Sequence, residues 1–321
     1  MELKGHTIGF KGEYSATVLK ADGTVKEFLN EEKTLRSGDV IKNLLLDNFF
    51  AKLIAETSPI SVTTIRCGSG SAPVNASQSS LTNQLTLISG NWPSANTAGA
   101  ANAVVDGSLL KANISFTFTF ALGQISGNIS ELGINFAGTA TASNTLIHSR
   151  ALVVDNLGNP TTISVSTEEQ LIITYTLKME TPVADVVTTV PMLINGVPTD
   201  VEVTQRWAFL RQLQVYTDSR FHDAAASFSV YNGALNGISA NPAGTSASIS
   251  SGGLSFSYNV SSGKTTTYSL SITQGNLSGG ISALIPVTNN SVVKFGFNPP
   301  IPKTADRTLS ITVRQTFGRL P

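Results

Sequence analysis

The sequence predicts a mainly β protein. We expect two β-sandwich-like domains, an N-terminal β-hairpin followed by one α-helix, and a long β-hairpin that connects the sandwiches. Three observations lead to this prediction. Most of the chain after residue 56 alternates apolar and polar residues with a period of two. Clusters of Gly, Asn and Pro separate the alternating runs. The pattern G-x-[IL]-S-G-x-I-S-x-L occurs twice, in "GQISGNISELGINF" at 123–136 and "GNLSGGISALIPV" at 275–287.

The first unit, 1–56, contains both a strand pattern and a helix pattern. "YSATVLKADGTVKEFLNEE" alternates on both sides of Asp22-Gly23, which predicts a hairpin. After Ser37 the apolar spacing becomes helical until Pro59, so we expect one helix with a single buried stripe. The apolar residues of this stripe are Val40, Ile41, Leu44, Leu45, Phe49, Leu53 and Ile54.

The second unit, 57–182, is the first predicted sandwich. Four runs alternate as strands do: "ISVTTIRCG", "LKANISFTFTFAL", "TLIHSRALVV" and "EEQLIITYTLKM". The cluster "DNLGNP" at 155–160 predicts a turn between the last two runs. No convincing amphipathic helix follows residue 56, and the region is a β-sandwich candidate.

The third unit, 183–207, is the predicted connecting ribbon. Asn195-Gly196 is the strongest short hairpin signal in the chain, and the arms extend to about Ala184 and Trp207. Pro191 and Pro198 fit such a ribbon only at a sheet edge or near its turn. We assign Asn195, Gly196 and Trp207 as possible subunit contacts.

The fourth unit, 208–321, is the second predicted sandwich, and it echoes the first. "ISFTF" at 114–118 resembles "LSFSY" at 254–258, and "LIIT" at 171–174 resembles "LSIT" at 309–312. With the pattern described above, these matches occur in the same order along both halves. A duplicated module would explain them, but a composition rich in Ser and Gly also produces chance matches. Both explanations stay open.

Two long stretches of small residues occupy similar places, 89–108 and 232–253, before the matched I/L-S-F runs. Loops of this length are uncommon unless they bind a ligand or lie over a neighbour. Trp92, in the first of them, is a fourth possible subunit contact. A packing role for this tryptophan is the alternative.

Charge and composition exclude several classes of function. The chain has 321 residues, 21 basic and 21 acidic, and only 13% are charged. Because no basic cluster is present, we expect neither nucleic-acid binding nor a membrane-surface role. We expect no membrane insertion and no signal peptide, and Cys67 has no partner for an internal disulfide. A surface built mainly from Ser, Thr, Asn and Gly predicts strand edges that are covered by other subunits, and therefore a homo-oligomer.

The residues that could carry chemistry form no catalytic or metal-binding pattern. His6, His148 and His222 lack metal-ligand spacing, and no phosphate-binding, dinucleotide or nucleophile motif occurs. We therefore expect no cofactor, no metal and no enzymatic activity. Glu131 is the only acid between Lys111 and Asp155. It could serve a glycosidase, but we expect it to cap a turn or to meet Arg150 across the sheet.

Several motifs resemble a known family when they are taken together. "TTIRCGSGSAPVNASQSSLTNQL", "GNISELGINF", "LIHSRALVV" and "NPTTISVSTEEQLIITYTL" follow in the order used by structural proteins of tailed bacteriophages. Taken together, these motifs resemble those of tail-fibre, tail-appendage and minor tail proteins. The resemblance covers about 60–180, and the S-R-A-L element is missing from the second half. It implies a virion component without catalysis, made in the host cytoplasm.

The expected function is therefore that of a non-enzymatic, tail-associated virion protein that assembles through strand edges and loops into a fibre, sleeve or appendage. Its expected partners are copies of itself and other phage tail or head proteins, with the host surface as a further partner. Two alternatives stay open: a capsid decoration protein and a host-receptor or glycan-binding module. The position in the particle does not follow from the sequence.

Overall fold

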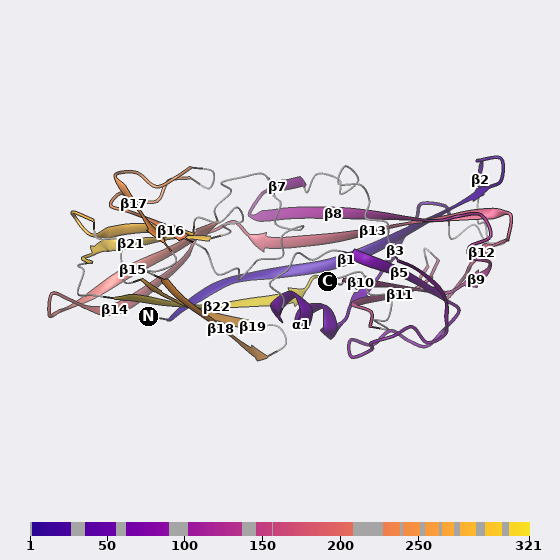
Figure 1. The fold of residues 1–321 in the computed structure, drawn as a ribbon, viewed down its shortest axis with the longest axis horizontal. Helices are drawn as coiled ribbons and strands as arrows, with labels where there is room; N and C mark the ends of the chain where they lie inside the picture. The colour runs from indigo at the N-terminus through magenta and orange to yellow at the C-terminus, as the bar shows by residue number, and fades with distance from the viewer. Residues whose placement is uncertain are drawn as a thin grey trace.

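The computed structural model describes residues 2–26, 36–55, 62–89, 102–136, 146–155, 157–207, 227–237, 240–250, 254–262, 265–272, 277–286, 293–303 and 308–321. Strands dominate this part of the chain, so the predicted mainly β class is confirmed. The molecule is elongated, with one smaller sheet near each end and a long sheet running between them (Figure 1).

The long sheet has nine strands. Its main path runs β18-β19-β22-β1-β13-β8-β7, and β2 and β3 also pair with β1. The strands are β1 (Glu2–Lys20), β2 (Val25–Lys26), β3 (Val40–Lys42), β7 (Asn102–Asp106), β8 (Leu109–Phe120), β13 (Glu169–Pro182), β18 (Leu254–Ser262), β19 (Thr265–Ile272) and β22 (Leu309–Arg319).

Each end of the molecule carries a second sheet. A five-stranded sheet has the order β4-β11-β10-β5-β6, and a six-stranded sheet has the order β14-β15-β21-β20-β16-β17. The first contains β4 (Leu44–Leu45), β5 (Val62–Gly68), β6 (Gln84–Ser89), β10 (Glu131–Phe136) and β11 (Ser149–Leu152). The second contains β14 (Val186–Ile194), β15 (Val197–Trp207), β16 (Ser227–Tyr231), β17 (Ser246–Ser250), β20 (Ile281–Pro286) and β21 (Val293–Ile301). A small pair joins β9 (Gly127–Ile129) to β12 (Ile163–Val165).

The N-terminal region confirms the hairpin and corrects the helix. β1 turns at Gly23, which has a φ of +81°, and pairs with β2. The predicted helix is wrong in its first half, because only α1 (Asp47–Ala55) is helical. Val40–Lys42 pairs with β1 and Leu44–Leu45 pairs with β11. The free strand edges offer these short segments backbone partners, so tertiary pairing overrides the helical spacing of their apolar residues.

The connecting ribbon has the predicted form. Asn195 and Gly196 have φ angles of +53° and +80°, as a two-residue hairpin turn of this kind requires. β14 is the end strand of its sheet, so Pro191 lies on an edge strand, as predicted. Pro198 follows the turn closely, and pairing of β15 with β21 begins only at Glu202.

β1 joins segments that the sequence pattern assigns to separate units. It pairs with β13 on one side and with β22 on the other, and it runs along much of the length of the molecule (Figure 1). Its buried side chains, including Ile8, Phe10 and Tyr14, belong to the same hydrophobic cluster as residues of both smaller sheets. The two sandwich-like halves therefore share one strand and one continuous core.

Gly12 gives a sharp test of how closely β1 is packed. A Cβ atom at this position would lie 2.6 Å from the side-chain nitrogen of Asn43 and would also meet the hydroxyl of Tyr175. Because both neighbours are held in the core, Gly12→Ala is expected to lower the free energy of unfolding by about 1–3 kcal/mol. Urea denaturation measures this loss. Gly23→Ala is not a suitable control because its φ is positive, whereas Gly318→Ala has open space and is expected to cost less than about 1 kcal/mol.

Candidate functional site

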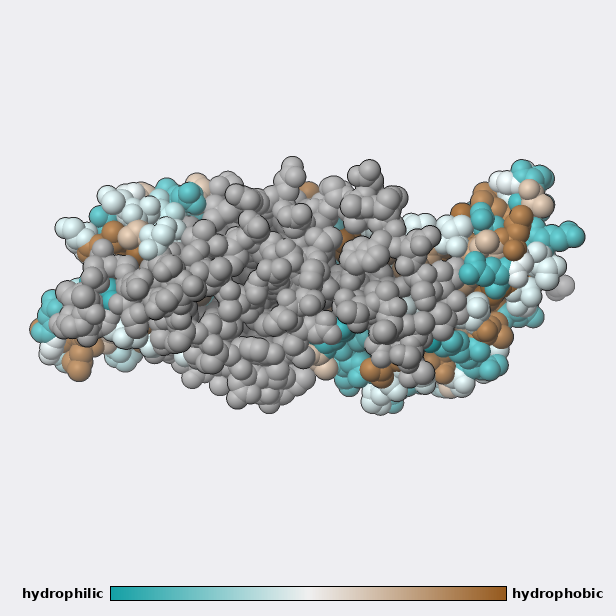
Figure 2. All heavy atoms as spheres, in the orientation of Figure 1, coloured by the Kyte–Doolittle hydropathy of each residue, from teal (hydrophilic) through white to brown (hydrophobic). Residues whose placement is uncertain are grey.

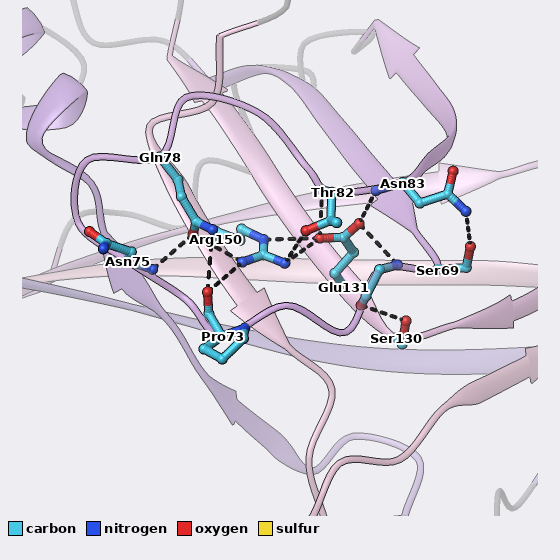
Figure 3. A network of polar contacts seen from close by, with 10 residues as sticks. Ser69, Pro73, Asn75, Gln78, Thr82, Asn83, Ser130, Glu131 and Arg150 are labelled. Carbon is cyan, nitrogen blue, oxygen red and sulfur yellow. Dashed lines mark hydrogen bonds and ion pairs between the residues drawn. The ribbon is translucent and has the colours of Figure 1, made fainter.

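The densest polar cluster among the described residues lies under the loop 69–83, which connects β5 to β6 (Figure 3). Glu131 is the first residue of β10, and Arg150 lies in the neighbouring strand β11. Both side chains are fully buried, and Arg150 Nη2 lies 2.6 Å from Glu131 Oε2. The expectation that Glu131 meets Arg150 across the sheet is confirmed.

Glu131 accepts hydrogen bonds from three backbone amides of the loop. Its Oε1 accepts from Gly70 N at 3.0 Å and from Asn83 N at 2.8 Å. Its Oε2 accepts from Thr82 N at 3.1 Å, as well as from Nε and Nη2 of Arg150. Five donors therefore occupy the two carboxylate oxygens, and the carboxylate also caps the turn, as expected.

Arg150 holds the other part of the same loop. Its Nη1 donates to the Pro73 carbonyl at 3.3 Å and to Gln78 Oε1 at 2.9 Å, and its Nη2 donates to Thr82 Oγ1 at 2.9 Å. Gln78 Oε1 also accepts from Asn75 N at 2.8 Å. The planar guanidinium thus joins the carboxylate to both arms of the loop.

Two glycines make room for the carboxylate. A Cβ on Gly68 would lie 2.6 Å from Glu131 Oε1, and a Cβ on Gly70 would meet the same oxygen and Thr82. The Gly68-Ser69-Gly70 element, written G-x-G below, lies in the stretch "TTIRCGSGSAPVNASQSSLTNQL", and its two glycines have a steric reason here. Ser130 Oγ donates to the Gly70 carbonyl at 2.8 Å and fixes the loop from the other direction.

The electrostatics of the cluster favour the ionised form of the Glu131 carboxylate. Burial tends to raise the pKa of Glu131, but the amides of Asn83 and Thr82 and the charge of Arg150 outweigh it, so this pKa lies below its ordinary value. Both side chains are buried, and both carboxylate oxygens already accept hydrogen bonds from the loop amides and from Arg150. The arrangement suits the fixing of a loop, and it offers no general acid or base.

A second buried group, His148, adjoins this sheet. Its Nδ1 accepts a hydrogen bond from Phe136 N at 3.0 Å. Burial, followed by the charge of Lys52, lowers the pKa of His148 to about 3, so the ring is neutral at ordinary pH. Ser149 bonds instead to the Tyr14 hydroxyl at 2.6 Å. His148 and Ser149 therefore have different partners, and they form no nucleophile–base pair with each other.

The four possible subunit contacts are placed unequally. Trp92 lies outside the described residues, as do His6's side chain and His222. Asn195 and Gly196 form the tip of the β14–β15 ribbon, and Trp207 pairs through its backbone with Val293. Asn195, Gly196 and Trp207 belong to the β14–β15 ribbon of the six-stranded sheet, whereas Glu131 and Arg150 belong to the five-stranded sheet. Across the described ranges, no group of three or more His, Cys, Asp or Glu is arranged to hold a metal ion.

Sequence reasoning missed the polar residues of the loop that complete the cluster, namely Gln78, Thr82 and Asn83. Their spacing carries no periodic signal, and only the glycines before them and the acid and base in two later strands could have pointed to a common contact. It also missed Lys294, which is fully buried in β21.

Comparisons with protein-family models, curated proteins and solved structures found no match to the chain. Among the residues that the structure describes, no helix has the length and apolar character needed to cross a membrane.

Proposed function

We propose that the chain is a non-enzymatic structural component of a tailed-bacteriophage virion, associated with the tail as a fibre, sleeve or appendage. One observation carries the proposal. The motifs that resemble the phage proteins, G-x-G with the following loop, I-S-E-L-G and S-R-A-L, supply the Gly70, Glu131 and Arg150 that meet in one buried cluster. A shared motif of this kind preserves the shape of a loop, which is what an assembling protein needs from its surface.

The sheet edges support assembly between copies of the chain. β14 is an edge strand of nine residues without a charged side chain, although Pro191 interrupts its row of amides. Leu193 is 74% exposed and Val197 is 61% exposed beside the ribbon turn. Figure 2 shows small groups of hydrophobic residues at the two ends of this face, interleaved with hydrophilic ones. We propose that a second copy covers the ribbon.

Charges on the ribbon are expected to weaken this association. In the double variant Val187→Lys and Leu193→Lys, two exposed apolar side chains become like charges on an edge strand. The dissociation constant of self-association, measured by analytical ultracentrifugation over a range of concentrations, is expected to rise at least about tenfold. Val104→Lys places a similar charge on the exposed part of β7 and serves as the control. An unchanged constant in the double variant would remove the ribbon from the interface.

Immunogold electron microscopy tests the location. Antibody against the purified chain is applied to intact particles of the phage whose genome encodes the chain. Gold on or around the tail supports the proposal, whereas gold over the head moves the function to capsid decoration. Particles without any gold, in a preparation where the free chain binds the antibody, contradict a role in the virion.

A further inference from the structure

The order of the strands in the sheets shows a repeat. The short sequence matches between the two halves show only part of it. In the five-stranded sheet, β4, β11, β10, β5 and β6 follow one another as antiparallel neighbours. In the six-stranded sheet, β15, β21, β20, β16 and β17 do the same. The corresponding strands also occur in the same order along the chain.

The long sheet contains the same correspondence around β1. Read outward from β1, one side continues β13-β8-β7 and the other continues β22-β19-β18. β13 runs antiparallel to β1, and β22 runs parallel to it. This is the arrangement that a twofold axis perpendicular to the sheet would produce. Gly9 pairs with both Glu180 and Gly318, which are equivalent positions of β13 and β22, so the axis passes near Gly9.

The strand register corrects the sequence alignment. Phe120 of β8 pairs with Leu171, and Ile272 of β19 pairs with Leu309. The counterpart of β8 is therefore β19, and the match of 114–118 to 254–258 is wrong, because β18 takes the place of β7. With this correction 113–132 aligns with 265–284 without a gap. The loop 232–245 connects β16 to β17, as the loop 69–83 connects β5 to β6, so these two loops correspond. The earlier comparison of 232–253 with 89–108 is therefore wrong.

The shared motif makes a similar contact in both halves, although the two acceptor carbonyls lie one position apart in the strand register. Ile129 and Leu132 are fully buried in the first copy, and Ile281 and Leu284 are fully buried in the second. The serine between them holds the loop in each case. Ser130 Oγ donates to the Gly70 carbonyl at 2.8 Å. Ser282 Oγ donates to the Asn232 carbonyl at 3.0 Å.

The buried cation also has a counterpart. Leu132 pairs with Ala151, and Leu284 pairs with Phe295, so Arg150 corresponds to Lys294. Lys294 is fully buried, and its Nζ donates to the carbonyls of Gly237 at 2.5 Å and Ala240 at 2.8 Å. The S-R-A-L element is thus replaced in the second half by 293–296, which retains a base at the same place.

The carboxylate differs between the copies. Ala283 occupies the position of Glu131, and the returning end of the loop is capped by another group. Thr245 N donates to Asn232 Oδ1 at 2.8 Å, in the way that Asn83 N donates to Glu131 Oε1. Burial and the charge of Arg206 lower the pKa of Lys294. This direction agrees with an ammonium group that is bound by two carbonyls and, among the described residues, by no carboxylate.

We infer that the chain is an internal duplication of one module about β1, and that Lys294 and Ser282 are positioning residues that fix the loop 232–245 as Arg150 and Ser130 fix the loop 69–83. Sheet order, register and matched contacts support this duplication whether or not the chain belongs to a virion. The buried Lys294 thereby has a role that follows from Arg150, its counterpart in the first half.

Hydrogen–deuterium exchange of the full-length chain, read by mass spectrometry, tests this assignment. Lys294→Met is expected to speed amide exchange about tenfold or more in 232–245 and to leave 69–83 unchanged. Lys294→Arg is expected to restore much of the protection. Lys178→Met, which removes a partly exposed ion pair with Glu13, serves as the control and is expected to change neither loop.

The matched serine variants test the equivalence even where Lys294→Met does not fold. Ser282→Ala is expected to speed exchange several-fold in 232–245 only, and Ser130→Ala is expected to do so in 69–83 only. Faster exchange spread evenly over the chain, or no change in 232–245 for either Lys294→Met or Ser282→Ala, would overturn the proposed role of these residues.

Discussion

Arg150→Met is expected to lower the free energy of unfolding by about 3–5 kcal/mol. The variant leaves the Glu131 carboxylate buried without its cation, and it also removes the donors to Pro73, Gln78 and Thr82. Methionine has a similar length and fills much of the same space, so the loss reports the missing charge and hydrogen bonds rather than a cavity. Urea denaturation followed by tryptophan fluorescence and by circular dichroism measures it.

Two further variants define the cause of this loss. Arg206→Met breaks an ion pair with Asp185 that is more than a quarter exposed on both sides, and it is expected to cost only about 1 kcal/mol. The double variant Arg150→Met and Glu131→Leu is expected to recover part of the stability, since it removes the unpaired charge. If Arg150→Met costs no more than Arg206→Met, the buried cluster does not stabilise the loop as we describe.

Acid is expected to destabilise the protein from about pH 6.5 downward. His148 is neutral in the folded protein with a pKa of about 3, whereas its ordinary value is 6.5. Between these values the unfolded chain binds a proton that the folded chain does not. Stability from this residue is therefore complete above pH 6.5 and falls by up to about 1.4 kcal/mol per pH unit as the pH decreases.

Glu131 adds to the acid loss at lower pH. Its folded pKa lies below the ordinary 4.5, so its contribution is present above pH 4.5 and is lost as the pH falls through the folded value. Urea midpoints measured between pH 8 and pH 4 test the slope of the histidine. His148→Gln keeps an acceptor for Phe136 N and is expected to flatten the curve between pH 6.5 and pH 5. If the urea midpoint of this variant falls as steeply with decreasing pH as that of the original chain, groups other than His148 cause the loss of stability.

The sequence predicted most elements whose signal is local. The strand alternation of β8 and β13, the turn at Asp22-Gly23 and the ribbon turn at Asn195-Gly196 all occur where they were expected. Part of the site was predictable as well, because a lone acid in an apolar strand required a partner and Arg150 was the nearest base. These inferences needed only period, turn chemistry and charge pairing.

The rest depends on contacts between distant segments. The short strands β3 and β4 have helical spacing, and only the edges of β1 and β11 make them strands. The alignment of 114–118 with 254–258 followed similar letters, but the register of β19 against β22 identifies the true counterpart. The cation in β21 could not be recognised from its letters, since Lys294 replaces Arg150 and its acidic partner is absent. Outside hairpins, local pattern carries no information on which strands become neighbours.

The position of β1 has a consequence for how the chain folds during synthesis. Its residues 9–20 pair with β13, which the ribosome completes when residue 182 has been made. Residues 2–10 pair with β22 and must wait until 312–319 have emerged. Such a long sequence separation slows closure of the sheet. Until then one edge of the first strand stays open to other nascent chains, so we expect yield at high expression rates to depend on how quickly the C-terminal strand arrives.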